Sequence, residues 1–284
     1  MQPWDPEHGV DRELAVRLVG AIWSDLGSEP VYVGSGWDVD VWRFGAYAVR
    51  FPRRAFGIAC LENELRVLPA IADRVVVPVP RPLRIGEPAF GYPSRFYVHA
   101  FLAGAPLIRT PCELAVLAAP LGAFLRELHA IDVPLHDDPR GGIPQVAARA
   151  LARLELVPDD VADRARVILT APPSGEPPRT VIHGDLHAAN LLVDARGLCG
   201  VIDWGDAARG DPAVDLAVAW SALPPDARPA FRAAYGPIDP DTWARARIHA
   251  VSRHCFALLA WGRDRGDAAI VRWATAALAR ALAE

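Results

Sequence analysis

The amino-acid sequence predicts an α+β fold with two lobes of different class. In the first third of the 284 residues, apolar and polar side chains alternate between glycine- and proline-rich turns, a pattern typical of β-strands. After Pro111 the chain is rich in Ala, Leu and Arg at helical spacing. We therefore expect an N-terminal lobe (1–102), with a five-stranded, mostly antiparallel sheet and one main helix, and a larger, mainly helical C-terminal lobe (103–284).

Within the N-terminal lobe, residues 11–27 are predicted to form an amphipathic helix with Asp11 as its N-cap. A glycine-containing turn at 34–36 predicts a hairpin, and residues 59–72 have the spacing of the lobe's main helix. Strands are expected at 31–33, 39–44, 47–51, 75–85 and 96–101.

The C-terminal lobe contains one β-like segment, 180–202, among its predicted helices. Proline- and glycine-rich stretches such as 171–178 are expected to be surface loops between them. Helices are expected at 114–131, 146–156, 160–169, 212–221, 227–235, 241–261 and 267–282.

Composition excludes several classes of function. The net charge of −4 is too small to predict a basic surface for nucleic acid or membrane. The sequence contains no lysine, which excludes a Walker-A lysine and Schiff-base chemistry. It also lacks a signal-peptide pattern and an apolar run of about 18 residues. We expect a cytoplasmic protein whose four scattered cysteines are reduced.

Three oxygen-bearing side chains lie close together in sequence in and just after the β-like segment. Asp185 follows an apolar strand, Asn190 begins a short hairpin, and Asp203 ends its return strand. Phosphoryl transfer requires a carboxylate near the attacking hydroxyl, and an amide and a second carboxylate are suitable Mg²⁺ ligands. The alternative, a metal-hydrolase H-x-D-x-H site at 183–187, has no second cluster of His and Asp to complete it.

The run H-G-D-L-H-A-A-N-L-L at 183–192, followed by V-I-D-W-G at 201–205, resembles the catalytic and metal-binding segments of the aminoglycoside phosphotransferase family, relatives of protein kinases. L-R-E-L-H-A-I at 125–131 and G-D-P-A-V-D-L-A at 210–217 are also similar to segments of that family. The resemblance extends from Gly34 to near the end of the chain and implies a protein-kinase-like fold.

The resemblance also implies roles for the three residues. Asp185 corresponds to the catalytic base, and Asn190 and Asp203 correspond to the Mg²⁺ ligands. Asp215 would brace the catalytic loop by accepting backbone N–H bonds, and His183 would tie that loop to the core. The co-substrate implied is ATP or GTP.

Nucleotide-binding residues follow from the same resemblance. Protein kinases and many family members place a lysine in the third strand to hold phosphates; here Arg50 occupies that position, and Glu64 is the carboxylate expected to orient it. The run R-F-P-R-R at 50–54 is similar to macrolide kinases, although Arg53 and Arg54 are interpreted as a solvated strand end. The phosphate loop and the purine-binding hinge (100–103) are expected to include Gly34, Ser35, Gly36, Ala100 and Leu102.

The acceptor expected from the resemblance is a hydroxylated small molecule, an antibiotic of the aminoglycoside or macrolide type. The acidic residues of the C-terminal lobe are interleaved with arginines, which weakens the aminoglycoside case. A metabolite kinase acting on an amino alcohol or sugar, and a pseudokinase that only binds nucleotide, remain alternatives. No nucleic-acid or membrane partner is expected, and the chain is predicted to be a monomer or weak dimer.

Overall fold

The computed structural model describes residues 6–24, 26, 29–140, 142–171, 173 and 175–284. Within these residues the chain forms two compact units. The first contains the described residues up to Asp73, then Pro78–Leu102 and Asp203–Asp206; the second contains Arg74–Val77, Ala103–Ile202 and Ala207–Glu284.

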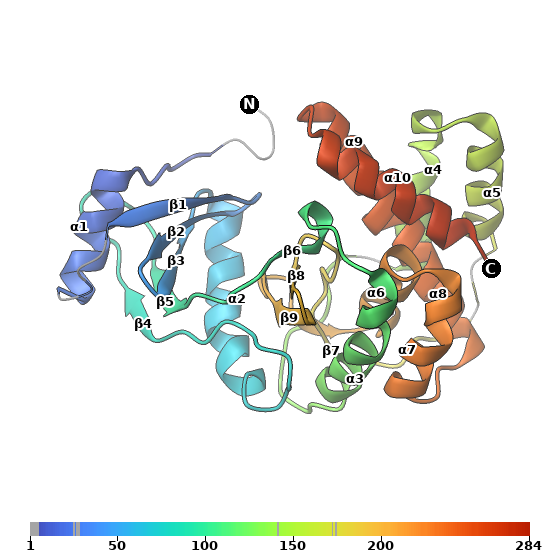
Figure 1. Ribbon diagram of the computed structural model, residues 1–284, viewed down its shortest axis with the longest axis horizontal. Helices are drawn as coiled ribbons and strands as arrows, with labels where there is room; N and C mark the ends of the chain where they lie inside the picture. The colour runs from blue at the N-terminus through green and yellow to red at the C-terminus, as the bar shows by residue number, and fades with distance from the viewer. Residues whose placement is uncertain (1–5, 25, 27–28, 141, 172, 174) are drawn as a thin grey trace. The chain divides into compact units, whose positions relative to one another are not determined.

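A five-stranded sheet forms the first unit, with strand order β1-β2-β3-β5-β4 and antiparallel neighbours throughout. This sheet, seen in blue and cyan in Figure 1, confirms the predicted fold class. Its strands are β1 (Pro30–Ser35), β2 (Val39–Phe44), β3 (Tyr47–Pro52), β4 (Arg84–Gly86) and β5 (Phe96–Ala100).

Helix α1 (Arg12–Ile22) packs its apolar residues against one set of sheet side chains. The Asp11 carboxylate accepts from the Leu14 N–H at 2.8 Å, so the predicted N-cap is confirmed. Asp25 and Gly27, at the end of the predicted helix, lie outside the described residues. Val49 and Phe51 of β3 share a buried cluster with Leu18 of α1. Arg50, which lies between these two strand residues, bonds instead to Glu64 of helix α2 (Ala55–Ile71). The strand's period of two thus separates the apolar core from the polar site.

The predicted strand at 75–85 is wrong over most of its length. Only Arg84–Gly86 pairs with β5, through the register Arg84↔Val98. Pro78, Pro80 and Pro82 have no N–H to donate to a neighbouring strand, so this stretch cannot form a continuous ladder.

Helices dominate the second unit. Every residue of α6 is buried, which places that helix at the centre of the unit. The α-helices are α3 (Ala118–His129), α4 (Ile143–Leu151), α5 (Asp159–Leu169), α6 (Ala213–Ala222), α7 (Arg228–Tyr235), α8 (Pro240–His249), α9 (Leu258–Asp264) and α10 (Ala268–Leu282). Short 3₁₀ segments are η1 (Leu107–Arg109), η2 (Leu114–Leu117), η3 (Leu154–Leu156) and η4 (Pro225–Ala227).

The single helix predicted at 241–261 is in fact three segments. Between α8 and α9 the chain forms a π-helix, η5 (Ala250–Ala257). π-Helical turns are rare and occur frequently at functional sites. Apolar periodicity does not distinguish the two helix types, so the interruption was not visible in the sequence.

Two small sheets lie within the second unit. β7 (Thr180–Ile182) pairs antiparallel with β10 (Ala208–Gly210). β8 (Leu191–Asp194) is the central strand between β6 (Ala105–Pro106) and β9 (Gly197–Val201). The loop between β7 and β8 contains the motif residues 183–190.

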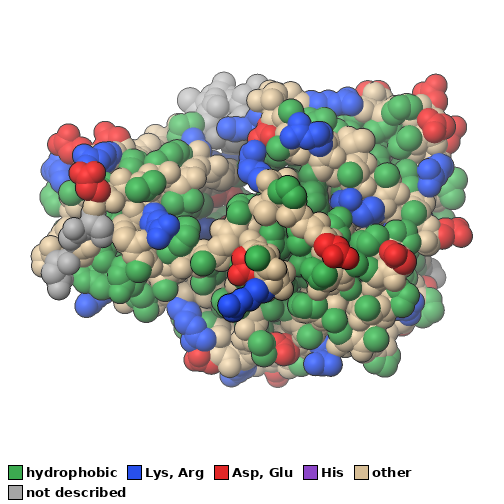
Figure 2. All heavy atoms as spheres, viewed as in Figure 1, with side chains coloured by type: hydrophobic (Ala, Val, Ile, Leu, Met, Phe, Trp, Pro, Cys, Tyr) green, Lys and Arg blue, Asp and Glu red, His purple; other side chains and the backbone are tan. Residues whose placement is uncertain are grey.

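The described surface mixes both signs of charge. On the face drawn in Figure 2, arginine and acidic side chains are interspersed with apolar atoms. Among the described residues, no helix combines the length and apolar character required to cross a bilayer.

Candidate active site

Asp215, at the start of α6, anchors the loop that follows β7. Its two carboxylate oxygens accept from the backbone N–H groups of His183 (2.7 Å) and Gly184 (2.9 Å). His129 of α3 lies 3.2 Å from the same carboxylate. Burial opposes ionisation, but these donors outweigh it and hold the pKa of Asp215 below its ordinary value. The predicted bracing role of Asp215 is confirmed.

The His183 ring fastens the loop to the strand that returns from β9. Its Nε2 donates to the Ile202 carbonyl at 3.0 Å, and its Nδ1 accepts from the Asp185 N–H at 3.2 Å. Gly184 between them has a φ of 87°, a backbone conformation that favours glycine. His183 is fully buried, so the prediction that it ties the loop to the core is confirmed.

Three side chains of the second unit converge on the Asp185 carboxylate. His187 Nε2 and Arg253 Nη2 each lie 3.3 Å from one of its oxygens, and Asn190 Nδ2 lies 3.4 Å from Oδ2. Burial raises the pKa of Asp185, but His187, Arg253 and Arg140 outweigh this effect and hold the pKa well below its ordinary value. Asp185 is therefore a carboxylate at neutral pH, as a proton acceptor must be.

Asn190 has the geometry of a metal ligand with one oxygen available. Its Nδ2 donates to the Asp185 carbonyl at 2.9 Å, which fixes the amide orientation. Among the described residues, no donor bonds to its Oδ1. An amide oxygen held in this way suits Mg²⁺, which takes hard oxygen ligands.

In the first unit, Arg50 and Glu64 form the predicted ion pair. Arg50 Nε and Nη2 donate to the two Glu64 oxygens at 3.0 and 2.9 Å. Glu64 also accepts from the Tyr97 hydroxyl (3.1 Å) and the Trp204 N–H (2.9 Å). Although burial opposes the charge of Arg50, Glu64 and Tyr97 raise its pKa, so it stays a cation. Glu62, two positions from Glu64, pairs instead with Arg95 at 2.8 Å.

Asp203 adopts an unusual backbone conformation beside this pair. Its φ of 68° is uncommon for a residue other than glycine, and such strain clusters at functional sites. Its Oδ1 accepts from Arg50 Nη2 at 2.9 Å, whereas Oδ2 has no partner among the described residues. With 47% of the side chain exposed, Asp203 also fits the oxygen chemistry of Mg²⁺.

The segment after Asp203 is tied to α2. The Asn63 amide donates to the Gly205 carbonyl at 2.9 Å, and a Cβ at Gly205 would meet Cys60 Cβ at 2.6 Å. Trp204 is fully buried. These contacts hold residues 203–206 in the first unit, beside the Arg50–Glu64 pair.

The expected phosphate loop lies at the tip of the β1–β2 hairpin. Gly34 and Ser35 end β1, and Gly34 has a φ of 150° with open space where a Cβ would stand. The Ser35 hydroxyl accepts from Tyr32 at 2.9 Å, and the Gly36 N–H donates to the Val39 carbonyl at 2.9 Å. Because that bond closes the hairpin, the Gly36 N–H is not available for phosphate in this conformation.

The expected hinge begins where β5 ends. The Ala100 carbonyl bonds to the His99 ring at 2.8 Å, and the Phe101 N–H donates to Ala46. Among the described residues, neither the N–H nor the carbonyl of Leu102 is hydrogen-bonded, so both are available to a planar ligand with complementary edges.

Sequence reasoning was wrong about two arginines and missed several site residues. Arg53 and Arg54 are half-buried in ion pairs with Asp40 (3.7 Å) and Asp38 (2.6 Å) rather than forming a solvated strand end. Contacts to the site from Asn63, Tyr97, Arg140 and Arg253 were not predicted. Since each of these residues is far in sequence from its partner, no local motif could have identified it.

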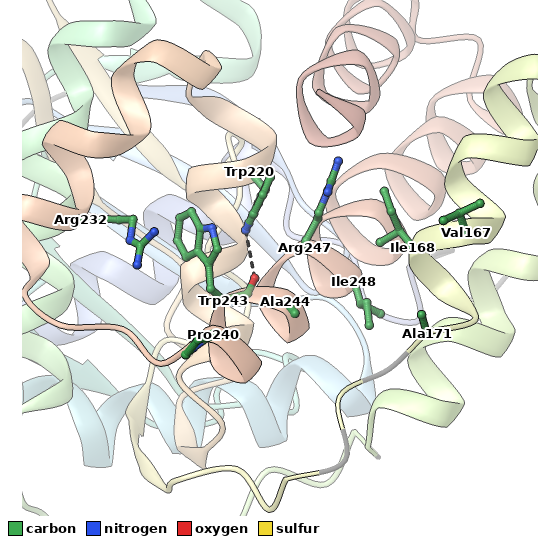
Figure 3. A pocket seen from close by; sticks show the side chains of 10 residues that line it. All are labelled: Val167, Ile168, Ala171, Trp220, Arg232, Pro240, Trp243, Ala244, Arg247 and Ile248. Atoms are coloured by element: carbon green, nitrogen blue, oxygen red, sulfur yellow. Dashed lines mark hydrogen bonds between the residues drawn. The ribbon is translucent and has the colours of Figure 1, made fainter. Parts of the chain in front are cut away.

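The second unit contains a hollow of about 460 Å³ (Figure 3). Trp220 and Trp243 line it, and the Trp220 indole donates to the Trp243 carbonyl at 3.2 Å. The Arg247 guanidinium stacks on Trp220 and bonds to carbonyls at the end of α10. None of the predicted site residues lines this hollow.

The described residues contain no group of three His, Cys, Asp or Glu side chains placed to hold a metal, as the H-x-D-x-H alternative would require.

Comparison with known proteins places this architecture among phosphotransferases. The family model described as phosphotransferase enzyme family matches residues 31–249. An aminoglycoside 3'-phosphotransferase of Escherichia coli is 33% identical over 142 residues, 44% of this chain. That match spans about half, 51%, of the relative's length.

Solved structures share the fold at lower identity. The GDP and kanamycin complex of APH(2")-IIIa has a TM-score of 0.72 at 20% identity, covering 94% of this chain and 97% of that one. The macrolide 2'-phosphotransferase MphH of Brachybacterium faecium has a TM-score of 0.62 at 22% identity, covering 94% and 97%.

Proposed function

This chain belongs to the phosphotransferase enzyme family, and from that premise we propose that it transfers the γ-phosphate of ATP or GTP to a hydroxyl group of a small molecule, with Mg²⁺. The observation that carries the proposal is the ionised Asp185 carboxylate, held by His187 and by the Asn190 amide on a buried, braced loop. Phosphoryl transfer needs positioning and charge stabilisation more than covalent chemistry by the protein.

Asp185 is the proposed base. One of its oxygens would accept the acceptor's hydroxyl proton as the oxygen attacks phosphorus, while His187 and Arg253 hold the carboxylate in place. A carboxylate with a lowered pKa is a weak base, so it serves mainly to orient the hydroxyl and to take its proton late in the transfer.

Asn190 Oδ1 and Asp203 Oδ2 are the proposed magnesium ligands. Both oxygens lack a partner among the described residues, and both are held by bonds to their other side-chain atom. When bound, magnesium would neutralise phosphate charge. The chain's own contribution is to hold these two oxygens in fixed orientations, through the bonds of Asn190 Nδ2 and Asp203 Oδ1.

Nucleotide binding is assigned to the N-terminal lobe (1–102), and the acceptor to the C-terminal lobe (103–284). Arg50, oriented by Glu64, would contact the α- and β-phosphates, since a guanidinium binds phosphate oxygens in a fixed geometry. The Leu102 backbone would bond to the purine edge. The remaining nucleotide contacts are assigned to Gly34, Ser35 and Ala100, whereas Gly36 closes the turn of this loop through its bond to Val39.

The acceptor proposed is an antibiotic, as for the relatives, which are named as aminoglycoside and macrolide phosphotransferases. We assign the enzyme to the cytoplasm, where nucleoside triphosphates are available, acting as a monomer or weak dimer. A kinase for a metabolite such as an amino alcohol or sugar is the alternative within the same chemistry.

A coupled assay of nucleoside diphosphate release tests the proposal. The purified chain is supplied with Mg-ATP or Mg-GTP and a panel of aminoglycosides, macrolides and small alcohols, with the Asp185→Asn variant as the control. Acceptor-dependent release in the wild type, with a phosphorylated product of the added mass, is expected. A wild-type protein that binds nucleotide but releases no more diphosphate than Asp185→Asn with any acceptor would be a pseudokinase.

A further inference from the structure

The Asp185 carboxylate is bordered by cationic and N–H groups rather than by acids. Arg253 Nη2 lies 3.3 Å from Oδ1, and His187 Nε2 lies 3.3 Å from Oδ2. The Arg140 guanidinium bonds to the carbonyl of Gly184, the residue just before Asp185. The exposed fractions of the Asp185, Arg253 and Arg140 side chains are 32%, 22% and 19%, so a bound molecule can reach all three.

The π-helix η5 places Arg253 at this position. Its neighbours on both sides are buried and bonded: Ser252 Oγ donates to the Val146 carbonyl at 2.7 Å, and His254 Nδ1 lies 2.9 Å from Ser221 Oγ. With both flanking side chains fixed in the interior, the direction in which Arg253 leaves the helix is constrained. Within this π-helix, Arg253 lies beside Asp185.

Carboxylates near the motif loop are already paired. Asp138 accepts from Arg140 Nε at 2.6 Å, Asp211 accepts from Arg245 Nε at 2.6 Å, and Asp215 accepts from two backbone N–H groups of the loop. None of these three is more than slightly exposed on its side chain. They offer little to an incoming ammonium group.

Two buried histidines near Arg253 are held neutral, mainly by burial. Burial, with a smaller contribution from the Arg253 cation, lowers the pKa of His249 to about 3. Burial also lowers the pKa of His254 well below its ordinary value, with His187 and Arg253 contributing. Both histidines are therefore neutral at physiological pH and add no charge to the site.

We propose that Arg253 selects against polycationic acceptors, so that the natural acceptor is a hydroxyl compound with at most one positive charge. This inference rests on the proposed function, because it concerns the acceptor of the same Asp185 site. A polyamine bound with its hydroxyl at Asp185 would bring ammonium groups towards the Arg253 guanidinium in a partly desolvated region. Like charges in such a position cost affinity and suppress the wrong partner.

The test measures kanamycin, a polyamine, and erythromycin, which has one amine, on three proteins. These are the wild type, Arg253→Glu, and the control Arg166→Glu, which makes the same charge change at an exposed residue of α5 whose ion pair with Asp163 is a solvent-exposed contact at 3.9 Å. Equilibrium Kd values are measured at low salt, so the comparison does not depend on turnover. Arg253→Gln is included because Glu at 253 places like charge beside Asp185.

Arg253→Glu is expected to bind kanamycin about tenfold more tightly than the wild type, with Arg253→Gln intermediate and Arg166→Glu unchanged. The affinity for erythromycin should change much less. The inference is overturned if the wild type binds kanamycin as tightly as Arg253→Glu, or if Arg166→Glu gives an equal gain. Release of nucleoside diphosphate by the wild type with water as acceptor reports separately on the proposed function, since it requires no acceptor site.

Discussion

Arg50 and Glu64 form a bidentate ion pair in the interior of the first unit, with nitrogen–oxygen distances of 3.0 and 2.9 Å. Both side chains are almost fully buried. Each charge has therefore lost most of its water, and loss of Arg50 leaves Glu64 as a buried carboxylate without a cation.

Replacing Arg50 by Ala should weaken nucleotide binding and lower stability together. Glu64 would keep only the Tyr97 and Trp204 donors, and breaking a buried pair of this kind costs about 3–5 kcal/mol of unfolding free energy. Denaturant titration and the KM for ATP or GTP measure the two effects. Arg12→Ala, which breaks an exposed pair with Glu29, is the matched control and should alter neither. An unchanged nucleotide KM in a folded Arg50→Ala protein would assign the phosphates to another cation.

Asp203→Asn should remove magnesium-dependent nucleotide affinity. Asn keeps the shape of Asp and tolerates the positive φ at this position, but it lacks the negative charge offered to the metal. Calorimetric titration of ATP with magnesium, and again with a chelator, should give nearly equal affinities for the variant. If magnesium strengthens binding to the variant as much as to the wild type, Asp203 is not a ligand.

Substituting Asp215 by Ala should loosen the loop at 183–190. Asp215 itself is not assigned a contact with substrate. The N–H groups of His183 and Gly184 would each lose a charged acceptor, and a buried unsatisfied donor costs about 1–3 kcal/mol. We expect lower unfolding free energy, faster amide exchange at both residues and reduced turnover. Asp226→Ala, at an exposed position of η4, provides the comparison. Unaltered exchange at 183 and 184 would contradict the bracing role.

Stability should fall as the solution is acidified from pH 7 towards pH 4. Burial lowers the pKa of His249 to about 3 and that of His99 to about 4, both below the ordinary 6.5. The unfolded chain then binds protons that the folded chain does not, so unfolding free energy is retained above about pH 6.5 and lost below it, by about 1.4 kcal/mol per pH unit for each histidine. The unfolding free energy of His249→Gln, measured by denaturant titration, should fall less between pH 7 and pH 5 than that of the wild type. An equal fall in both proteins would show that His249 does not cause the acid destabilisation.

Much of the fold was predictable because local pattern and tertiary structure agree. Hairpin turns at 34–36 and 45 separate strands of alternating polarity, and Asp11 marks the start of α1. Prediction failed at 75–83, where valines suggested a strand but three prolines removed the donors that a ladder needs. It also failed at η5, because apolar spacing alone does not register a change of helix type.

The motif residues were visible in the sequence, but the residues that hold them were not. Asp185, Asn190 and Asp203 lie within one short stretch, whereas Arg253 follows Asp185 by 68 positions. Tyr97 and Asn63 likewise reach their partners only through packing of α2 and β5. Such contacts depend on tertiary arrangement, and a single sequence does not encode them as a pattern.

The most direct test of the account is single-turnover phosphoryl transfer by Asp185→Asn, with nucleotide affinity measured on the same preparation. Removing a general base should lower the rate of transfer by about 10²–10⁴. Nucleotide affinity should stay at the wild-type value, because Asp185 is assigned to the acceptor hydroxyl. Transfer at close to the wild-type rate by a folded Asp185→Asn protein would contradict the assignment of Asp185 as the base.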